Sequence, residues 1–153
     1  MTSSSIVRKV AMAISGLFLV FFLAQHFTIN LTSVFSEEVF NNISHFMGTN
    51  PLVQFILQPI LIFGVVFHFV MGFILEIKNK KARRTSYASF KGSENSNWMS
   101  RNMIFSGLVI LSFLVLHFYD FWIPEMNYKY IEVLPDDPNR YHEELVHKFH
   151  SPY

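Results

Sequence analysis

The chain has 153 residues, of which 51% are hydrophobic, 15% are charged and 18 are Phe. A soluble domain of this length carries more charge and fewer apolar residues, so the composition indicates a protein that uses lipid as a solvent. The absence of Cys excludes disulfides, thiolate metal sites and iron–sulphur ligation within these residues. The net charge of +1 is uninformative as a sum, because the charges are unevenly distributed along the chain.

Long apolar runs occupy residues 10–31, 52–77 and 102–123. Runs of this length span about 30 Å of hydrocarbon at about 1.5 Å per residue. We therefore predict an all-α membrane protein whose residues 1–123 form three transmembrane helices. The first run is too long for the core of a signal peptide and has no small-residue cleavage site directly after it, so we expect it to be retained.

Residues 124–153 follow the third run and form a tail with mixed charge. Pro135 and Pro138 in this tail predict a turn. After them, Tyr141, Leu145 and Phe149 recur at a spacing of one helical turn, which predicts a short helix at the membrane surface.

The connection between the second and third runs, residues 78–101, is strongly basic and has a single carboxylate. By the positive-inside rule this connection is cytoplasmic, and Arg8 and Lys9 place the N-terminus on the same side. The connection at residues 32–51 has no Lys or Arg and is predicted to be an outer loop, in which His45 is solvated.

Each apolar run contains one histidine, and these are His26, His68 and His117. Ionisable residues are rare inside membranes, where they mark functional sites or form hydrogen bonds between helices. His26 and His117 each lie roughly 25 Å from the cytoplasmic end of their helix, whereas His68 lies roughly 15 Å from it. Imidazoles at matching depth on facing helices can bind both faces of a flat macrocycle. We therefore predict that His26 and His117 hold one haem b, and that His68 belongs to a different site.

The same pattern surrounds the two histidines of matching depth. Ser-Gly-Leu begins eleven residues before each of them, and Phe directly follows each. Eleven residues is almost three helical turns, so Ser15 and Ser106 lie on the same helix faces as His26 and His117. Each hydroxyl either contacts a cofactor or donates a hydrogen bond to a carbonyl of its own helix.

Gly64 and Gly72 lie one turn on either side of His68. Small residues at these positions allow the close approach either of a porphyrin or of a neighbouring helix. The sequence alone leaves both alternatives open.

These features resemble the cytochrome b membrane-anchor subunit of succinate dehydrogenase and fumarate reductase, of the di-haem, single-anchor type. The resemblance covers most of the chain. It rests on the three histidines, on R-K-x-x-M-A-x-S-G and Q-H-F-x-x-N-L in the first run, and on W-M-S-R-N-M at the start of the third. It implies a five-helix bundle with two b haems and menaquinone as substrate, of which this chain contains the first three helices.

By the same resemblance, His26 and His117 hold the outer haem, and His68 provides one ligand to the inner haem. Trp98 and Arg101 would contact the propionates of the inner haem, although an interfacial Trp and a topological Arg explain them equally well. The implied partners are an iron–sulphur subunit and a flavoprotein that carries the succinate site. This chain would then have no succinate active site and would pass electrons to quinone.

The family continues with a fourth helix that provides the remaining haem ligand, and with a fifth, whereas this sequence stops at Tyr153. We therefore expect a truncated chain that assembles the outer haem alone. One alternative is a self-contained, three-helix cytochrome b with a single haem, in which His68 is structural. Another is a haem-free transporter or assembly protein whose histidines link helices. No pattern indicates nucleic-acid binding.

Overall fold

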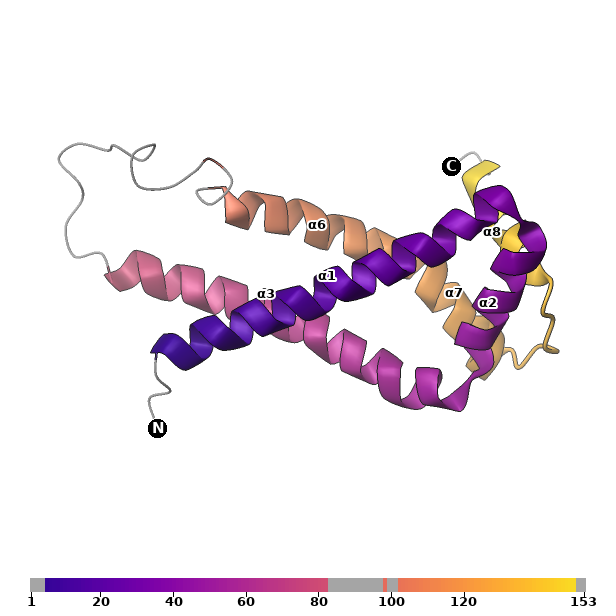
Figure 1. Cartoon of the computed structure of the whole chain (residues 1–153), viewed down its shortest axis with the longest axis horizontal. Helices are drawn as coiled ribbons and strands as arrows, with labels where there is room; N and C mark the ends of the chain where they lie inside the picture. Colours follow the sequence, from indigo (N-terminus) through magenta and orange to yellow (C-terminus); the bar gives the residue numbers. More distant parts are fainter. Residues whose placement is uncertain (1–4, 83–97, 99–101, 151–153) are drawn as a thin grey trace. The chain divides into compact units, whose positions relative to one another are not determined.

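The computed structural model describes residues 5–82, 98 and 102–150. Within these ranges the chain is helical and has no β-strand (Figure 1). Its main helices are α1 (Ser5–Phe35), α2 (Glu37–Thr49), α3 (Gln58–Ala82), α6 (Met103–His117) and α8 (Arg140–His150), with one π-helical turn, η1 (Val53–Leu57), leading into α3. The predicted all-α class is confirmed.

The chain divides into two compact units. The first comprises Met1–His68 and Asp136–Tyr153, and the second comprises Phe69–Pro135. The boundary between them falls inside α3, directly after His68. Both units therefore contain part of this helix.

The structure has three helical segments that are long and apolar enough to cross a membrane, Ile6–Phe35, Val53–Lys81 and Met103–Ile131. They include the predicted run 10–31 in full and all but the first residue of the predicted runs 52–77 and 102–123. Large apolar side chains on these segments are exposed, for example Phe21 at 72%. Exposure of so much apolar surface is unfavourable in water and is normal in lipid or against further helices. The three segments are consistent with a multi-pass membrane protein.

In the first unit, α1 crosses α3 (Figure 1), and a glycine on each helix lies at a close contact. A Cβ atom on Gly64 of α3 would lie 2.8 Å from Cε1 of Phe18. A Cβ atom on Gly16 of α1 would lie 3.3 Å from Cε1 of His68. Small residues at such contacts let helix backbones approach closely. The structure thus gives Gly64 a role in helix packing, which was one of its two alternatives.

The connection at residues 32–51, predicted as a loop, contains the helix α2. Ser36 caps its N-terminus, where the side chain accepts a hydrogen bond from the backbone N of Val39 at 3.3 Å. Glu37 and Glu38 occupy the first turn, where negative charge interacts favourably with the helix dipole. The apolar runs did not predict α2 because it is short and mixes apolar with polar residues.

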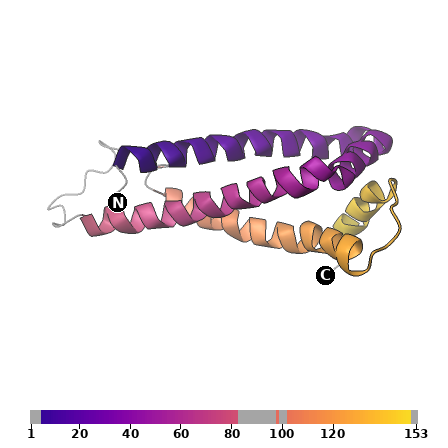
Figure 2. The same cartoon turned by 90° about the horizontal axis from the view of Figure 1, so that it is seen from below.

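The helix α8 packs against α2 within the first unit, and we refer to these two helices as the α2–α8 cap (Figure 1, and turned in Figure 2). Asn41 joins them, since Nδ2 donates to the carbonyl of Asn139 at 3.1 Å and Oδ1 accepts from the backbone N of His142 at 2.8 Å. Among the described residues, only Phe40, Asn41 and Arg140 are buried, so the protein core of the chain lies in this cap. The short helix predicted in the tail is confirmed by α8.

Two histidines of the α2–α8 cap lie near carboxylates. His142 donates from Nε2 to the carbonyl of Ser33 at 3.2 Å, and its Nδ1 lies 3.7 Å from Oε2 of Glu37. Nδ1 of His45 lies 3.5 Å from Oδ1 of Asp136. The prediction that His45 is simply solvated was wrong, because the segment that leads into α8 covers this part of α2.

In the second unit, the third apolar helix continues past residue 123, where the apolar run ends. After α6 come a single π-helical turn, η2 (Phe118–Trp122), then α7 (Ile123–Met126) and a second π-helical turn, η3 (Asn127–Ile131). Pro124 lies in the first turn of α7. Proline is tolerated in the first turn of a helix, where its missing N–H removes no hydrogen bond of that turn. The helical path therefore reaches residue 131.

Candidate functional site

His68 of α3 lies against α1 within the first unit. Its Nδ1 is 2.9 Å from Oγ of Ser15, and the same Oγ donates to the carbonyl of Met12 at 2.9 Å. Ser15 precedes His26 by eleven residues along α1, which is about 16 Å at about 1.5 Å per residue. His68 and His26 thus lie at different levels of the first unit.

His26 is half-buried and has a neighbour one turn away on each side along α1. Its ring stacks on Phe22, with the centroids 5.4 Å apart and the planes at 20°. Nδ2 of Asn30 donates to the backbone carbonyl of His26 at 2.8 Å. The same Nδ2 lies 3.4 Å from Nε2 of the His26 imidazole. These residues are spaced by four, so they form a column on one face of the helix.

His117 is the last residue of α6, and η2 follows it directly. Its ring stacks on Phe113, with centroids 5.7 Å apart and planes at 21°, and it lies 5.1 Å from the ring of Phe121 at 39°. Single π turns in helices frequently occur at functional sites, because they shift the side chains that follow out of α-helical register. Aromatic rings thus flank this imidazole on both sides along the helix.

Phe22 and Phe113 occupy equivalent positions next to His26 and His117, and the sequence reasoning above missed them. The signal is present in the sequence, because the repeat around the two histidines extends to F-L-x-x-H-F. In the structure, both pairs adopt nearly parallel stacking. A stacked ring restricts rotation of the imidazole and shields it from water, which is the role of the apolar shell around a metal ligand.

The two histidines of the predicted pair belong to different units, His26 to the first and His117 to the second. Their pairing on one haem therefore stays a prediction. Ser106 is exposed, and its hydroxyl donates to the carbonyl of Met103 at 3.0 Å, as expected for a serine bonded to its own helix. Ser15 makes the corresponding bond and contacts His68 as well.

Trp98 is 70% exposed, and its backbone carbonyl accepts a hydrogen bond from Nδ2 of Asn102 at 2.9 Å. Arg101 lies outside the described residues. The predicted contact of Trp98 and Arg101 with haem propionates therefore stays a prediction.

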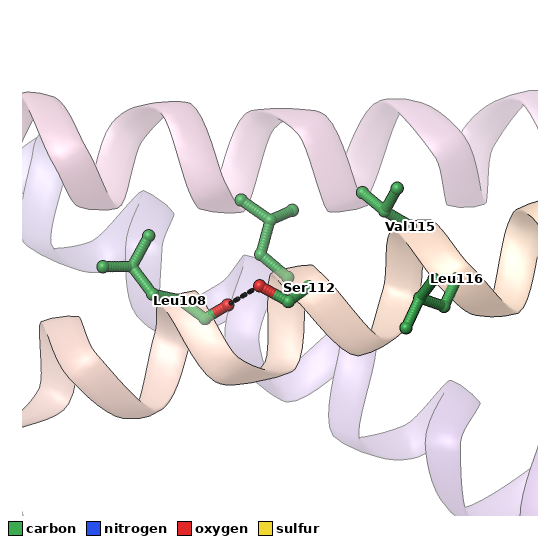
Figure 3. Close-up of a pocket in the computed structure, with 5 residues that line it drawn as sticks. Leu108, Ser112, Val115 and Leu116 are labelled. Atoms are coloured by element: carbon green, nitrogen blue, oxygen red, sulfur yellow. Dashed lines mark hydrogen bonds between the residues drawn. The ribbon is translucent and has the colours of Figure 1, made fainter.

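An open groove runs along α6 (Figure 3), and it is lined by Leu108, Leu111, Ser112, Val115 and Leu116. The hydroxyl of Ser112 donates to the carbonyl of Leu108 at 3.0 Å, so it is already engaged with its own helix. None of the candidate histidines lines this groove, and its lining has no titratable side chain. Its surface suits a lipid chain or a neighbouring helix and provides no ligand for a metal.

Three apolar helices, each with one histidine, and a repeated Phe–His stack are thus the features from which a function is inferred. Comparisons with protein-family models, with curated proteins and with solved structures found no match for this chain.

Proposed function

We propose that this chain is the cytochrome b membrane-anchor subunit of a succinate:quinone oxidoreductase. In this role it passes electrons between an iron–sulphur subunit and menaquinone through b haems. The observation that carries the proposal is the shared setting of His26 and His117. Each lies in the same repeat on an apolar helix, and each stacks on the Phe one turn before it. Equivalent imidazoles on two membrane helices are what a haem with two axial histidines requires.

The residues fit haem b. Imidazole nitrogen is a common ligand of haem iron, and aromatic rings lie beside His26 and His117 while a hydroxyl lies beside His68. His26 and His117 would hold the outer haem, and His68 would provide one ligand to the inner haem. The haem supplies a one-electron carrier. Phe22 and Phe113 hold the imidazoles in place and shield them from water.

The basic residues near the ends of the helices support a location in the cytoplasmic (inner) membrane. Arg8, Lys9 and the connection at residues 78–101 favour the cytoplasmic side, which is the side nearer to His68. The iron–sulphur subunit and the flavoprotein would bind on this side, and lipid and quinone would contact the apolar helices. Succinate chemistry would belong to the flavoprotein.

A second candidate is a self-contained cytochrome b with a single haem. The hydrogen bond between Ser15 and His68 favours it, because a contact of this kind is also what a purely structural histidine makes between membrane helices. In that case His26 and His117 would keep their role. His68 would only join α1 to α3.

The two candidates differ in their response to quinol. We expect the detergent-purified chain to show a low-spin b-type spectrum in the dithionite-reduced minus oxidised difference, and menaquinol to reduce the same haem under anaerobic conditions. Replacement of His147, an exposed residue of α8, by Ala serves as the control and should change neither result. Haem that dithionite reduces and menaquinol does not would favour the self-contained cytochrome. A chain that binds no haem would contradict both.

A further inference from the structure

The hydroxyl of Ser15 makes two hydrogen bonds at once. Its Oγ lies 2.9 Å from the carbonyl oxygen of Met12 and 2.9 Å from Nδ1 of His68. Both distances are those of well-formed hydrogen bonds. The first bond lies within α1, and the second joins α1 to α3.

The number of protons available decides which nitrogen of His68 is protonated. A backbone carbonyl only accepts hydrogen bonds, so the single hydroxyl proton of Ser15 is donated to Met12. The same Oγ then acts as the acceptor toward His68, and Nδ1 of the imidazole must carry the proton. In a neutral imidazole the lone pair is then on Nε2.

The backbone of α1 also helps to hold the imidazole. A Cβ atom on Gly16 would lie 3.3 Å from Cε1 and 3.9 Å from Nδ1 of His68. The first distance is tighter than an ordinary van der Waals contact, so the lack of a side chain at Gly16 lets the ring lie close to the helix. Ser15 and Gly16 together fix the ring next to α1.

We infer that Ser15 is a positioning residue for His68, which it holds as the Nδ1-protonated tautomer with Nε2 as the nitrogen that ligates haem iron. Iron-ligating histidines generally donate their second ring N–H to a neighbouring acceptor, which fixes the tautomer and the ring orientation. The inference rests on the proposed function in one respect, namely that the ligand of Nε2 is haem. The tautomer is inferred from the two hydrogen bonds of Ser15 and does not depend on haem.

Substitution at Ser15 tests the tautomer without any haem. Ser15→Ala removes the acceptor, whereas Ser15→Thr keeps a hydroxyl that can donate to its own helix in the same way. Ser112→Ala is the matched control, because Ser112 donates within α6 and contacts no histidine in the described part of the chain. The readout is the ¹⁵N NMR spectrum of ¹⁵N-histidine-labelled protein in lipid nanodiscs, with the His68 signals assigned by their loss in His68→Gln.

We expect Nδ1 of His68 to be the protonated nitrogen in the unsubstituted chain, in Ser15→Thr and in Ser112→Ala. In Ser15→Ala we expect a mixture of the two tautomers, because the acceptor that selects one of them is gone. An Nε2-protonated His68 in the unsubstituted chain, or an unchanged spectrum in Ser15→Ala, would overturn the inference whether or not the protein binds haem.

A second measurement tests the ligand. In the chain with His26→Ala and His117→Ala, His68 is the one histidine left in the three apolar segments. Haem b is titrated into the nanodiscs with added imidazole, which replaces the ligand that the family has on its fourth helix, and binding is followed by the optical spectrum. Adding Ser15→Ala should weaken haem binding by about 10- to 100-fold, because loss of a hydrogen bond to a metal-ligating histidine generally has an effect of this size. Ser15→Thr in its place should keep the affinity. If this chain binds no haem while Ser15 still controls the tautomer, the inner-haem role of His68 is contradicted and its positioning by Ser15 is not.

Discussion

Gly64 and Gly107 are both helical glycines, but they differ in what surrounds them. A Cβ atom on Gly64 would meet the ring of Phe18 at 2.8 Å, whereas a Cβ atom on Gly107 would meet nothing within 4 Å. Both lie inside apolar helices, so replacement by Ala improves the helix propensity at either position by about 1 kcal/mol. The difference between the two substitutions therefore isolates the contact between α1 and α3.

We predict that Gly64→Ala lowers the free energy of unfolding by about 1 to 3 kcal/mol relative to Gly107→Ala, because the ring of Phe18 must move away from the added methyl group. The measurement is denaturant unfolding of both variants in the same detergent, followed by circular dichroism. Equal stabilities for the two variants would show that Phe18 does not pack on Gly64.

At the scale of the elements, the α2–α8 cap is the part of the chain whose folding depends on protein contacts more than on lipid. Asn41 is only 3% exposed and provides both a donor and an acceptor to the segment of α8. Its replacement by an apolar residue leaves the backbone N of His142 and the carbonyl of Asn139 without this partner. Buried polar groups that lose a partner cost about 1 to 3 kcal/mol each.

We therefore predict that Asn41→Ala releases α8 from α2. The matched control is Asn42→Ala, since Asn42 is the next residue of α2 and its side chain is exposed. Hydrogen–deuterium exchange of the α8 amides should become faster in Asn41→Ala and remain unchanged in Asn42→Ala. Unchanged protection in both variants would mean that α8 is held by other contacts.

The elements differ in how well the sequence predicted them. The three apolar helices follow from hydropathy, and α8 follows from the spacing of Tyr141, Leu145 and Phe149, because each of these patterns lies within one element. The helix α2 was missed because it is too short to cross a membrane, although Ser36 and two acidic residues mark its start.

At the scale of the whole molecule, sequence patterns do not report how one helix is rotated against another. The contact of Ser15 with His68 depends on where α1 crosses α3, and this is set in part by the packing of Phe18 on Gly64. The repeat shared by α1 and α6 placed Ser15 on the same helix face as His26 and did not predict its contact with His68. The stacked Phe residues were within reach of the sequence, because they are part of the same repeat as the histidines.

At this scale we propose that His26 and His117, which belong to different units of the chain, ligate the same haem. If they do, loss of either imidazole removes the same low-spin haem, whereas His68 contributes nothing to it. The depth of the two residues and their equivalent Phe–His stacks both favour this pairing.

The most direct test is the haem content per polypeptide, with the reduced minus oxidised spectrum, of purified His26→Ala, His117→Ala and His68→Ala chains. The account predicts that His26→Ala and His117→Ala each lose the same low-spin b haem and that His68→Ala keeps it. Full retention of that haem in either His26→Ala or His117→Ala would contradict the pairing.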